Sequence, residues 1–474
     1  MKKLLQPQVQ LRCLCLFLCL ACNGIRSSQD KSDAENKASS EDIIFKGAQL
    51  LSMESEEILA AQNVWIREGK IYKRGKDWEI PAEATIIDAK GKYLMPGISE
   101  MHAHIPVAKE GNDELVRETL FLYLANGITT IRGMLGNPYH LELKKQVAKG
   151  EILSPRIYTS GTSVNGNSVP SLEVADQNIR AQKEAGYDFL KLHPGLKKEV
   201  FDEVVNTAKE VGILYAGHVS IDVGIRHALN SDYASVDHLD GYVEGLVPAS
   251  AGLNPNANGF FGFNFSEAVD LNLMDELAKL TKAKGVAVVP TQTLFTRWLS
   301  PTPPDEMAAQ PEMKYMNPRT LSNWQKGKFS LLANKAYSEE RYEKFLAIRH
   351  HIIQKLHEEE VLFLLGSDAP QVFNVPGFSI HHEIQSIIDA GISPYEVLKS
   401  GTVNPAAYFG QDGEYGQIIV GASADLILSE ENPLKNPASI KDNLGVMVQG
   451  KWLSREMIDK RLKEIEDKYA AMDG

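Results

Sequence analysis

His102 and His104, separated by one alanine, form the most informative chemical motif in the sequence. They follow the run 92–97 (Lys-Tyr-Leu-Met-Pro-Gly), and we expect them to close a β-strand. Because side chains at positions i and i+2 of a strand point to the same face, the two imidazoles can bind one divalent metal ion. Neutral nitrogen ligands suit zinc better than calcium or magnesium. The pair alone is weak evidence, since surface hairpins produce it by chance.

The elements that would position this pair lie in the middle of the chain, where short β-branched runs alternate with helical stretches. This alternation is typical of βα units around a parallel sheet. The eight candidate strands are 93–101, 128–134, 156–160, 189–192, 214–219, 235–239, 286–290 and 362–366. Eight such units predict a TIM-type (β/α)8 barrel, whose active site would lie at the C-terminal ends of the strands. The connections 247–265 and 297–349 are long enough to act as lids or binding surfaces.

Metal-binding or titratable side chains occur at the ends of five of these strands. They are His102 and His104 at the first strand, Lys191 and His193 at the fourth, His218 at the fifth, His238 at the sixth and Asp368 at the eighth. Chance easily places one of 12 histidines at a strand end, but rarely produces this joint arrangement. We therefore predict that these side chains meet at one rim of the barrel.

With these motifs the chain resembles the amidohydrolase superfamily, and within it the imidazolonepropionase-like and prolidase-like branch, over about residues 43–453. The motifs that carry the resemblance are 96–104 (with His-Ala-His), 187–191, 216–218, 236–238, 366–368, and the tail segments 394–406 and 421–426. Together they are specific, although none is specific alone. The sequence departs from the family at Glu100 and Gly133, where aspartate is the common residue, and these departures affect the surroundings of the ligands only.

The resemblance implies a site for two divalent metal ions, with zinc the expected metal. His102, His104 and Asp368 would bind the more buried ion, and His218 and His238 the more exposed ion. Lys191, carboxylated by carbon dioxide, would bridge the two ions, because a carbamate is an anionic bidentate ligand. Asp368 is also implied as the catalytic base. A site with one metal ion, in which Lys191 takes no part, stays open.

Other candidate residues have two interpretations each. His193 would either contact the substrate or make a structural hydrogen bond, and Tyr242 would either polarise a substrate carbonyl or pack in the core. His381 and His382 open a predicted helix, where a structural role is favoured. The cluster Phe260–Phe263 is typical of loop packing, although its place above the barrel is compatible with a substrate shelf.

The first 22 residues predict an exported, membrane-anchored bacterial lipoprotein. A basic start precedes the apolar stretch 13–21, which is shorter than the ~20 residues that a membrane-spanning helix needs. Leu20-Ala21-Cys22 resembles a lipoprotein cleavage site with Cys22 as the lipidated residue, although Cys19 stands where leucine is usual. The polar segment 23–42 predicts a flexible tether. All four cysteines lie in the leader, so the mature chain would have no disulfide and no thiolate metal ligand.

Composition and the two β-rich ends complete the predicted organisation. Segments 43–94 and 407–455, with strands expected at 416–419, 424–428 and 446–451, would form one composite β-sandwich domain beside the barrel 95–406, followed by a C-terminal helix at 456–474. The net charge of −12, about −15 without the leader, disfavours nucleic acid as a partner. A homo-oligomer is compatible with the sequence.

The predicted function is hydrolysis of an amide-type C–N bond by metal-activated water. The expected substrates are small: an N-acyl amino acid, a dipeptide or a cyclic amide. The same activated water would also serve esters, lactones or phosphotriesters. A surface lipoprotein that binds a ligand without turnover is disfavoured, because every implied metal ligand and the implied base are present.

Overall fold

The computed structural model describes residues 41–472, so the predicted leader and almost all of the tether lie outside the described residues. Asp42, the last residue of the expected tether, is buried and bonded to Arg67 at 3.0 Å, and it accepts a hydrogen bond from the Thr85 amide. Asp42 therefore belongs to the folded body, so the predicted tether would have to end before it. Within residues 41–472, no helix has the length and apolar character needed to cross a membrane.

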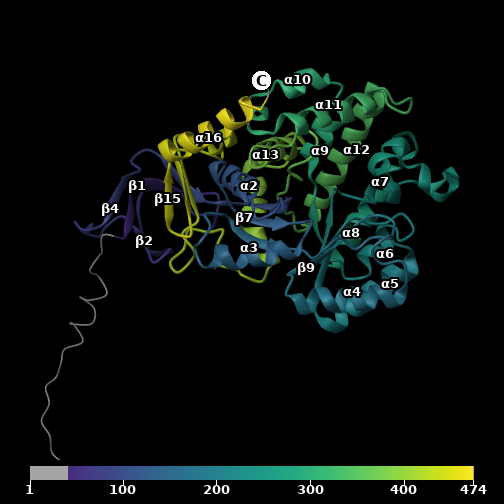
Figure 1. Cartoon of the computed structure of the whole chain (residues 1–474), viewed down its shortest axis with the longest axis horizontal. Helices are drawn as coiled ribbons and strands as arrows, with labels where there is room; N and C mark the ends of the chain where they lie inside the picture. The colour runs from purple at the N-terminus through teal and green to yellow at the C-terminus, as the bar shows by residue number, and fades with distance from the viewer. Residues whose placement is uncertain (1–40, 473–474) are drawn as a thin grey trace, which may run out of the picture.

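One eight-stranded sheet unites strands from the N- and C-terminal parts of the described chain, and in Figure 1 the yellow β15 lies beside the purple N-terminal strands. Its order is β15-β14-β13-β5-β1-β2-β3, with β4 paired to β1. The strands are β1 Ile43–Leu51, β2 Ile58–Arg67, β3 Lys70–Gly75, β4 Thr85–Asp88, β5 Tyr93–Pro96, β13 Leu426–Ser429, β14 Gly445–Val448 and β15 Lys451–Ser454. The expected pairing of N- and C-terminal segments is thus observed.

The expected β-sandwich is not confirmed, because the structure has one sheet here where a sandwich requires two. Lys70 of the edge strand β3 forms an isolated β-bridge with Ser423, which lies just before β13. The sheet therefore folds back on itself and encloses an apolar core. Residues 416–419, expected as a strand, form a bend followed by an irregular stretch instead. Gly416 has a φ of +80°, and a Cβ there would lie 2.2 Å from the Thr402 carbonyl oxygen, so the backbone turns sharply at this point.

The expected first barrel strand, 93–101, is divided between two sheets. Its first part is β5, and its second part is β6 (Ile98–Ala103) in a parallel sheet. The division falls at Pro96, which has no amide hydrogen, and Gly97, whose amide donates to the Asp425 carbonyl at 2.8 Å. A Cβ on Gly97 would lie 2.2 Å from Thr129 Oγ1, so only glycine fits this crossing. His102 therefore lies inside β6, and His104 follows it directly.

Seven of the eight expected barrel strands are present as two parallel sheets, β6-β7-β8 and β12-β11-β10-β9. The remaining bounds are β7 Ile128–Gly133, β8 Arg156–Thr159, β9 Phe189–Leu192, β10 Leu214–Gly217, β11 Ser235–Asp237 and β12 Ala287–Val289. A bridge from Ser160 to Phe189 joins the two sheets. Their strands end toward the same side, which is the arrangement that a rim of site residues requires.

The eighth expected strand, 362–366, is not a continuous strand, so the structure does not contain a fully closed ladder. Its segment makes isolated bridges instead, from Phe363 to Val288 and from Ala369 to Ala103. Asp368 has a left-handed backbone with a φ of +62°, which interrupts the extended conformation between these bridges. The segment still lies between β12 and β6, so it delivers Asp368 to the same rim.

Helices cover the parallel strands and bury the largest apolar core of the described chain (Figure 1). The longer helices are α2 Glu114–Ala125, α3 Pro138–Ala148, α4 Leu172–Ala185, α5 Lys198–Val211, α8 Met274–Ala283, α11 Pro318–Leu332, α12 Glu339–Glu358, α13 Ser379–Asp389, α14 Pro394–Gly401 and α16 Arg455–Ala470. The shorter ones are α6 Ile225–Leu229, α7 Tyr242–Gly245, α9 Gln292–Trp298, α10 Pro304–Ala308 and α15 Val403–Tyr408. The expected C-terminal helix is α16, and it joins the sheet to the barrel helices because Lys468 and Tyr469 both bond to Glu118 of α2.

Candidate active site

Asp368 lies at the centre of the predicted rim, in contact with three histidines from two strands. Its Oδ1 lies 2.7 Å from His104 Nε2 and 3.4 Å from His102 Nε2, and its Oδ2 lies 3.7 Å from His238 Nδ1. One possible donor atom from each of His102, His238 and Asp368 lies within 4.8 Å of the others, and all three residues are buried. This spacing suits a single shared ion.

Three of the histidines turn one ring nitrogen toward a fixed protein oxygen. His102 Nδ1 lies 2.9 Å from Asp237 Oδ2, and His218 Nδ1 lies 3.0 Å from Asp240 Oδ2. His238 Nδ1 lies 2.9 Å from Thr291 Oγ1. Metal-binding histidines usually make such a second contact, which fixes the ring and leaves the other nitrogen available. Burial first, then the charge of Lys191, holds the pKa of His102 well below its usual range, so its ring is neutral as a metal ligand must be.

The rings of His193, His218 and His238 form a row that continues away from Asp368. Ring centroids are 5.2 Å apart for His193 and His218, and 4.6 Å apart for His218 and His238. Burial, reinforced by Lys191, lowers the pKa of His218 to about 3. His193 is half-buried, and its Nδ1 lies 2.8 Å from Ser163 Oγ, so its position fits both a structural hydrogen bond and a place beside the substrate.

Lys191 lies beneath this row, and its ammonium group has no hydrogen-bond partner among the described residues. The side chain is fully buried, and Nζ is 3.7 Å from Asp237 Oδ2. Burial lowers the pKa of Lys191, and Asp237 and Asp368 only partly oppose this shift. Gly217 makes room for the chain, since a Cβ there would lie 2.8 Å from Lys191 Cδ. A buried cation without hydrogen bonds is costly, so this lysine needs either a neutral form or a further partner.

A metal ion therefore fits the residues present. The donor set is imidazole nitrogen and carboxylate oxygen, the low pKa of His102 keeps its ring neutral, and the buried Lys191 Nζ has no hydrogen-bond partner among the described residues. Among the described residues, His102, His238 and Asp368 are grouped closely enough to hold a metal ion. The other three residues predicted as ligands lie near this group: His104 contacts Asp368, His218 lies beside His238, and Lys191 lies beside Asp237.

Arg132 and Asp237 form a buried ion pair behind the site that the sequence analysis did not identify. Arg132 Nη2 lies 3.0 Å and 3.1 Å from the two Asp237 oxygens, and Arg132 Nε donates to the Met101 carbonyl. Burial alone would raise the pKa of Asp237, but the charges of Arg132 and Lys191 outweigh it and hold that pKa below its usual range. A sequence signal existed: both charged residues interrupt apolar strand runs, and buried charges must be paired.

We expect Arg132→Met to lower the free energy of unfolding by about 3–5 kcal/mol, because it leaves the buried Asp237 carboxylate without its ion-pair partner. Urea unfolding followed by circular dichroism measures the change. The matched control is Arg180→Met, since Arg180 makes ion pairs with Asp176 and Glu210 at the surface. That control should change stability by less than about 1 kcal/mol. Equal effects of the two substitutions would contradict the structural role of Arg132.

Glu100, one of the two departures from the family pattern, joins the segments that carry His102 and Asp368. Its carboxylate accepts hydrogen bonds from the His102 amide at 3.0 Å and the Ser367 amide at 2.8 Å, and a further one from Ser367 Oγ at 2.5 Å. Burial raises the pKa of Glu100 to about 8, so the group is readily neutral. The longer glutamate side chain therefore bridges two site segments and makes no contact with the metal-binding atoms.

Backbone strain and a second buried arginine fix the ends of the site segments. His238, Thr291 and Asp368 all have left-handed backbones, with φ values of +64°, +44° and +62°. Such conformations in residues other than glycine cluster at functional sites, where the surrounding structure enforces them. Arg349 supplies part of this support, because it donates to the His238 carbonyl at 2.9 Å and the Pro290 carbonyl at 3.0 Å.

Tyr242 is not brought to the site. It is fully buried in α7, and its hydroxyl lies 2.9 Å from Thr281 Oγ1 of α8. The structure therefore supports its packing interpretation. The residue follows His238 by four positions, but the left-handed backbone at His238 and Leu239 turns the chain before Tyr242.

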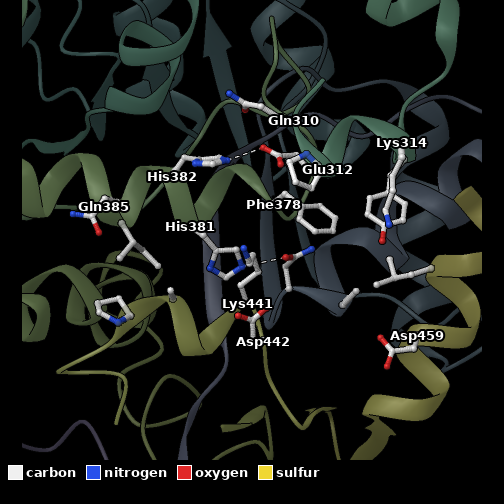
Figure 2. Close-up of a pocket in the computed structure, with 18 of the residues that line it drawn as sticks. Gln310, Glu312, Lys314, Phe378, His381, His382, Gln385, Lys441, Asp442 and Asp459 are labelled. Atoms are coloured by element: carbon white, nitrogen blue, oxygen red, sulfur yellow. Dashed lines mark hydrogen bonds and ion pairs between the residues drawn. The ribbon is translucent and has the colours of Figure 1, made fainter. Parts of the chain in front are cut away.

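A separate cavity of about 940 Å³ lies between α13, α16 and residues 310–315, and none of the six predicted ligands lines it (Figure 2). His381 Nε2 lies 3.1 Å from Asn126 Oδ1, and His382 Nε2 lies 2.8 Å from Glu312 Oε1. Arg297 also pairs with Glu312, at 3.3 Å. The two histidines hold neighbouring segments together, which agrees with the structural role favoured for them.

The chain is similar in sequence to curated enzymes. The chain is 23% identical over 439 residues to "Adenine deaminase 2" of Bradyrhizobium sp. (strain ORS 278), covering 89% of this chain and 60% of that protein. It spans about a quarter to three fifths of the length of the curated adenine deaminases that it matches.

Solved structures share the fold. "Bottromycin amidohydrolase" matches with a TM-score of 0.67 at 21% identity, covering 91% of this chain and 92% of that one. A Xaa-Pro dipeptidase with methionine bound in its active site matches with a TM-score of 0.62 at 18% identity, covering 87% and 100%. Residues 93–453 match the sequence profile described as "Amidohydrolase family", which includes all six predicted ligands. The chain belongs to the amidohydrolase family.

Proposed function

We propose that this protein is a metal-dependent hydrolase that cleaves an amide-type C–N bond of a small substrate. The observation that carries the proposal is the convergence of His102, His238 and Asp368 on one point near Lys191, whose Nζ has no hydrogen-bond partner among the described residues. The family membership agrees with this function, and so do the fold relatives that are named as an amidohydrolase and a dipeptidase.

We further propose that the site binds two ions, most suitably zinc, bridged by a carboxylated Lys191. A carbamate would replace the buried ammonium group with an anion that can bind metal. This would remove the cost of burying a cation whose Nζ has no hydrogen-bond partner among the described residues. His102, His104 and Asp368 would hold one ion, and His218 and His238 the other. The grouping of donor atoms of His102, His238 and Asp368 within 4.8 Å also suits a single shared ion, which is the competing arrangement.

The chemistry follows from the position of Asp368. Bound divalent metal would lower the pKa of water toward neutrality and polarise the substrate carbonyl. Asp368, which contacts His104 and His102 and is held by its strained backbone, would accept the proton and pass it to the leaving nitrogen. Asp240 and Thr291 keep His218 and His238 in fixed orientations, so these side chains need not reorganise during the reaction.

A hydrolysis screen of the zinc-loaded protein tests the proposed function. Dipeptides, N-acyl amino acids and cyclic amides form one arm, and we expect turnover of at least one of them. Adenine forms the second arm because curated relatives are named adenine deaminases, and ammonia release would favour that C–N bond. Esters, lactones and a phosphotriester form the third. Turnover confined to the third arm, or no turnover in any arm, would overturn the proposal.

We also propose that the protein is exported and anchored by a lipid on Cys22. The motif Leu20-Ala21-Cys22 after a short apolar stretch supports this. We expect Cys22→Ser to move the protein from the membrane fraction to the soluble fraction, because serine has no thiol to carry the lipid and the anchoring acyl chains would be absent. Fractionation and immunoblotting of both forms measure it, with Cys15→Ser as the matched control. Equal partitioning of wild type and Cys22→Ser would contradict the anchor.

A further inference from the structure

Phe261 stands directly beside the histidine row. Its ring centroid lies 5.3 Å from that of His238 and 5.8 Å from that of His218. The ring is half-buried and packs edge-on against Phe295 at 5.2 Å and Phe260 at 4.6 Å. An aromatic face therefore borders the proposed metal ligands, where a substrate would lie.

The loop that carries Phe261 is held in this position by its own contacts. Phe261 has a φ of +51°, a strained value for a residue other than glycine. The adjacent Gly262 packs so closely on α7 that a Cβ would lie 2.6 Å from Val243. Asn258 anchors the preceding residues by donating to Glu244 at 2.6 Å. The strain is therefore imposed by the fold, and its effect is to direct the ring toward His218 and His238.

The cavity next to this ring has a lining that favours an uncharged occupant. It measures about 560 Å³, and His193 and His218 are among the residues that line it. Phe260, Phe261, Leu196 and Val219 supply much of its apolar wall. Its charged lining residues are the carboxylates Asp222 and Asp240, and no lysine or arginine is among the described residues that line it. A carboxylate on the substrate would find no lysine or arginine in this wall, and it would lie near the Asp222 carboxylate, whose charge has the same sign.

We infer that this cavity binds an uncharged apolar group of the substrate and that Phe261 sets this selectivity. The inference rests on the proposed function and narrows its substrate class. Among the candidate amides, it favours those with an aliphatic or aromatic group beside the scissile bond over those with a free carboxylate there. One misfitting group in such a pocket typically changes kcat/KM by ~10–200-fold, which makes the effect measurable.

The test compares 4-nitroanilides that share one scissile bond and differ in the side chain next to it: leucine, lysine and glutamate. For the zinc-loaded enzyme we expect kcat/KM for leucine to exceed that for glutamate on the order of 100-fold. Phe261→Ala should reduce that ratio at least about tenfold, and Phe261→Leu should restore most of it. Phe261→Arg should shift preference toward glutamate. A preference for lysine would mean that the carboxylates dominate over the aromatic wall, and it would overturn the inference.

Phe263→Leu is the matched control. Phe263 belongs to the same loop, but its ring packs on Phe345 at 5.4 Å and Tyr337 at 6.0 Å, away from the histidine row. We expect this variant to leave the leucine-to-glutamate ratio within about twofold of the wild type, because it leaves the cavity wall intact. An equal loss of selectivity in Phe263→Leu and Phe261→Ala would show that loop packing, and not the Phe261 ring, is responsible.

A binding measurement separates this inference from the proposed function. The α-hydroxamates of leucine and glutamate chelate metal and need no turnover, so calorimetric titration of the zinc-loaded protein compares the same side chains. Tighter binding of the leucine compound, lost in Phe261→Ala, supports the inference even if no amide is hydrolysed, in which case only the proposed function fails. Equal binding of both compounds, or no binding of either, overturns the inference whether or not an amide is hydrolysed.

Discussion

Asp368→Asn is expected to lower kcat by at least ~10²–10⁴-fold on the best substrate, because the amide keeps the shape of the side chain but cannot accept a proton. The structure gives this residue the central position: it contacts His104 at 2.7 Å, His102 at 3.4 Å and His238 at 3.7 Å. The fold should persist, since the asparagine can still accept a hydrogen bond from His104. Steady-state kinetics on the zinc-loaded protein measures the loss.

The metal content of the same sample must accompany this measurement, because losing a carboxylate ligand can also release metal. Asp389→Asn is the matched control, since Asp389 lies at the end of α13 and is bonded to Gln385 at the surface. That control should retain wild-type kcat. If a metal-replete Asp368→Asn enzyme keeps near-wild-type kcat, the base lies elsewhere, and His193 is the next residue to replace.

The clustering of the candidate ligands was predictable from the sequence because each one follows from a local rule. Each candidate is a histidine, lysine or aspartate at the C-terminal end of a predicted strand. Because parallel strands end on the same side, they bring these residues to one rim. This reasoning correctly grouped His102, His104, His238 and Asp368, which come from positions up to 266 residues apart. It required no knowledge of how the intervening helices pack.

The supporting residues were harder to predict because their roles depend on contacts across the fold. Arg349 reaches the His238 carbonyl from α12, 111 positions away, and no local pattern distinguishes it from the charged residues around it. Asp240 and Thr291 are likewise recognisable only once their partner histidines are placed. Tyr242 illustrates the opposite error, since nearness in sequence to His238 suggested a role that the backbone turn removes.

The contrast between local patterns and contacts across the fold also explains where the predicted fold was wrong. Periodicity located seven barrel strands but gave one continuous strand at 93–101, where Pro96 and Gly97 pass the chain from one sheet to another. The apolar run at 362–366 also suggested a full strand, and the left-handed backbone of Asp368 is invisible to any hydrophobic pattern. In both places the departure from regular structure lies beside the site.

Lys191→Ala is expected to lower the metal content from about two ions per chain toward one, since a carboxylated lysine would contribute an oxygen to each ion. The physical reason is the unusual state of this side chain. Its Nζ is fully buried, has no hydrogen-bond partner among the described residues, and lies 3.7 Å from the Asp237 carboxylate, which Arg132 already neutralises. Elemental analysis of protein prepared with zinc and bicarbonate measures the change.

Lys328 provides a matched control, because it is an equally buried lysine whose ammonium group is fully bonded. Its Nζ donates to the carbonyls of Arg297 and Ser300, each at 2.8 Å, and to two further oxygens, so it needs no other partner. Lys328→Met should lower stability yet leave the metal content of the folded protein unchanged. One ion in the wild type, unaltered in Lys191→Ala, would instead establish the single-ion arrangement, with His238 and Asp368 shared around that ion. Two burial-matched lysines therefore separate a metal-bridging role from the general cost of removing a buried cation.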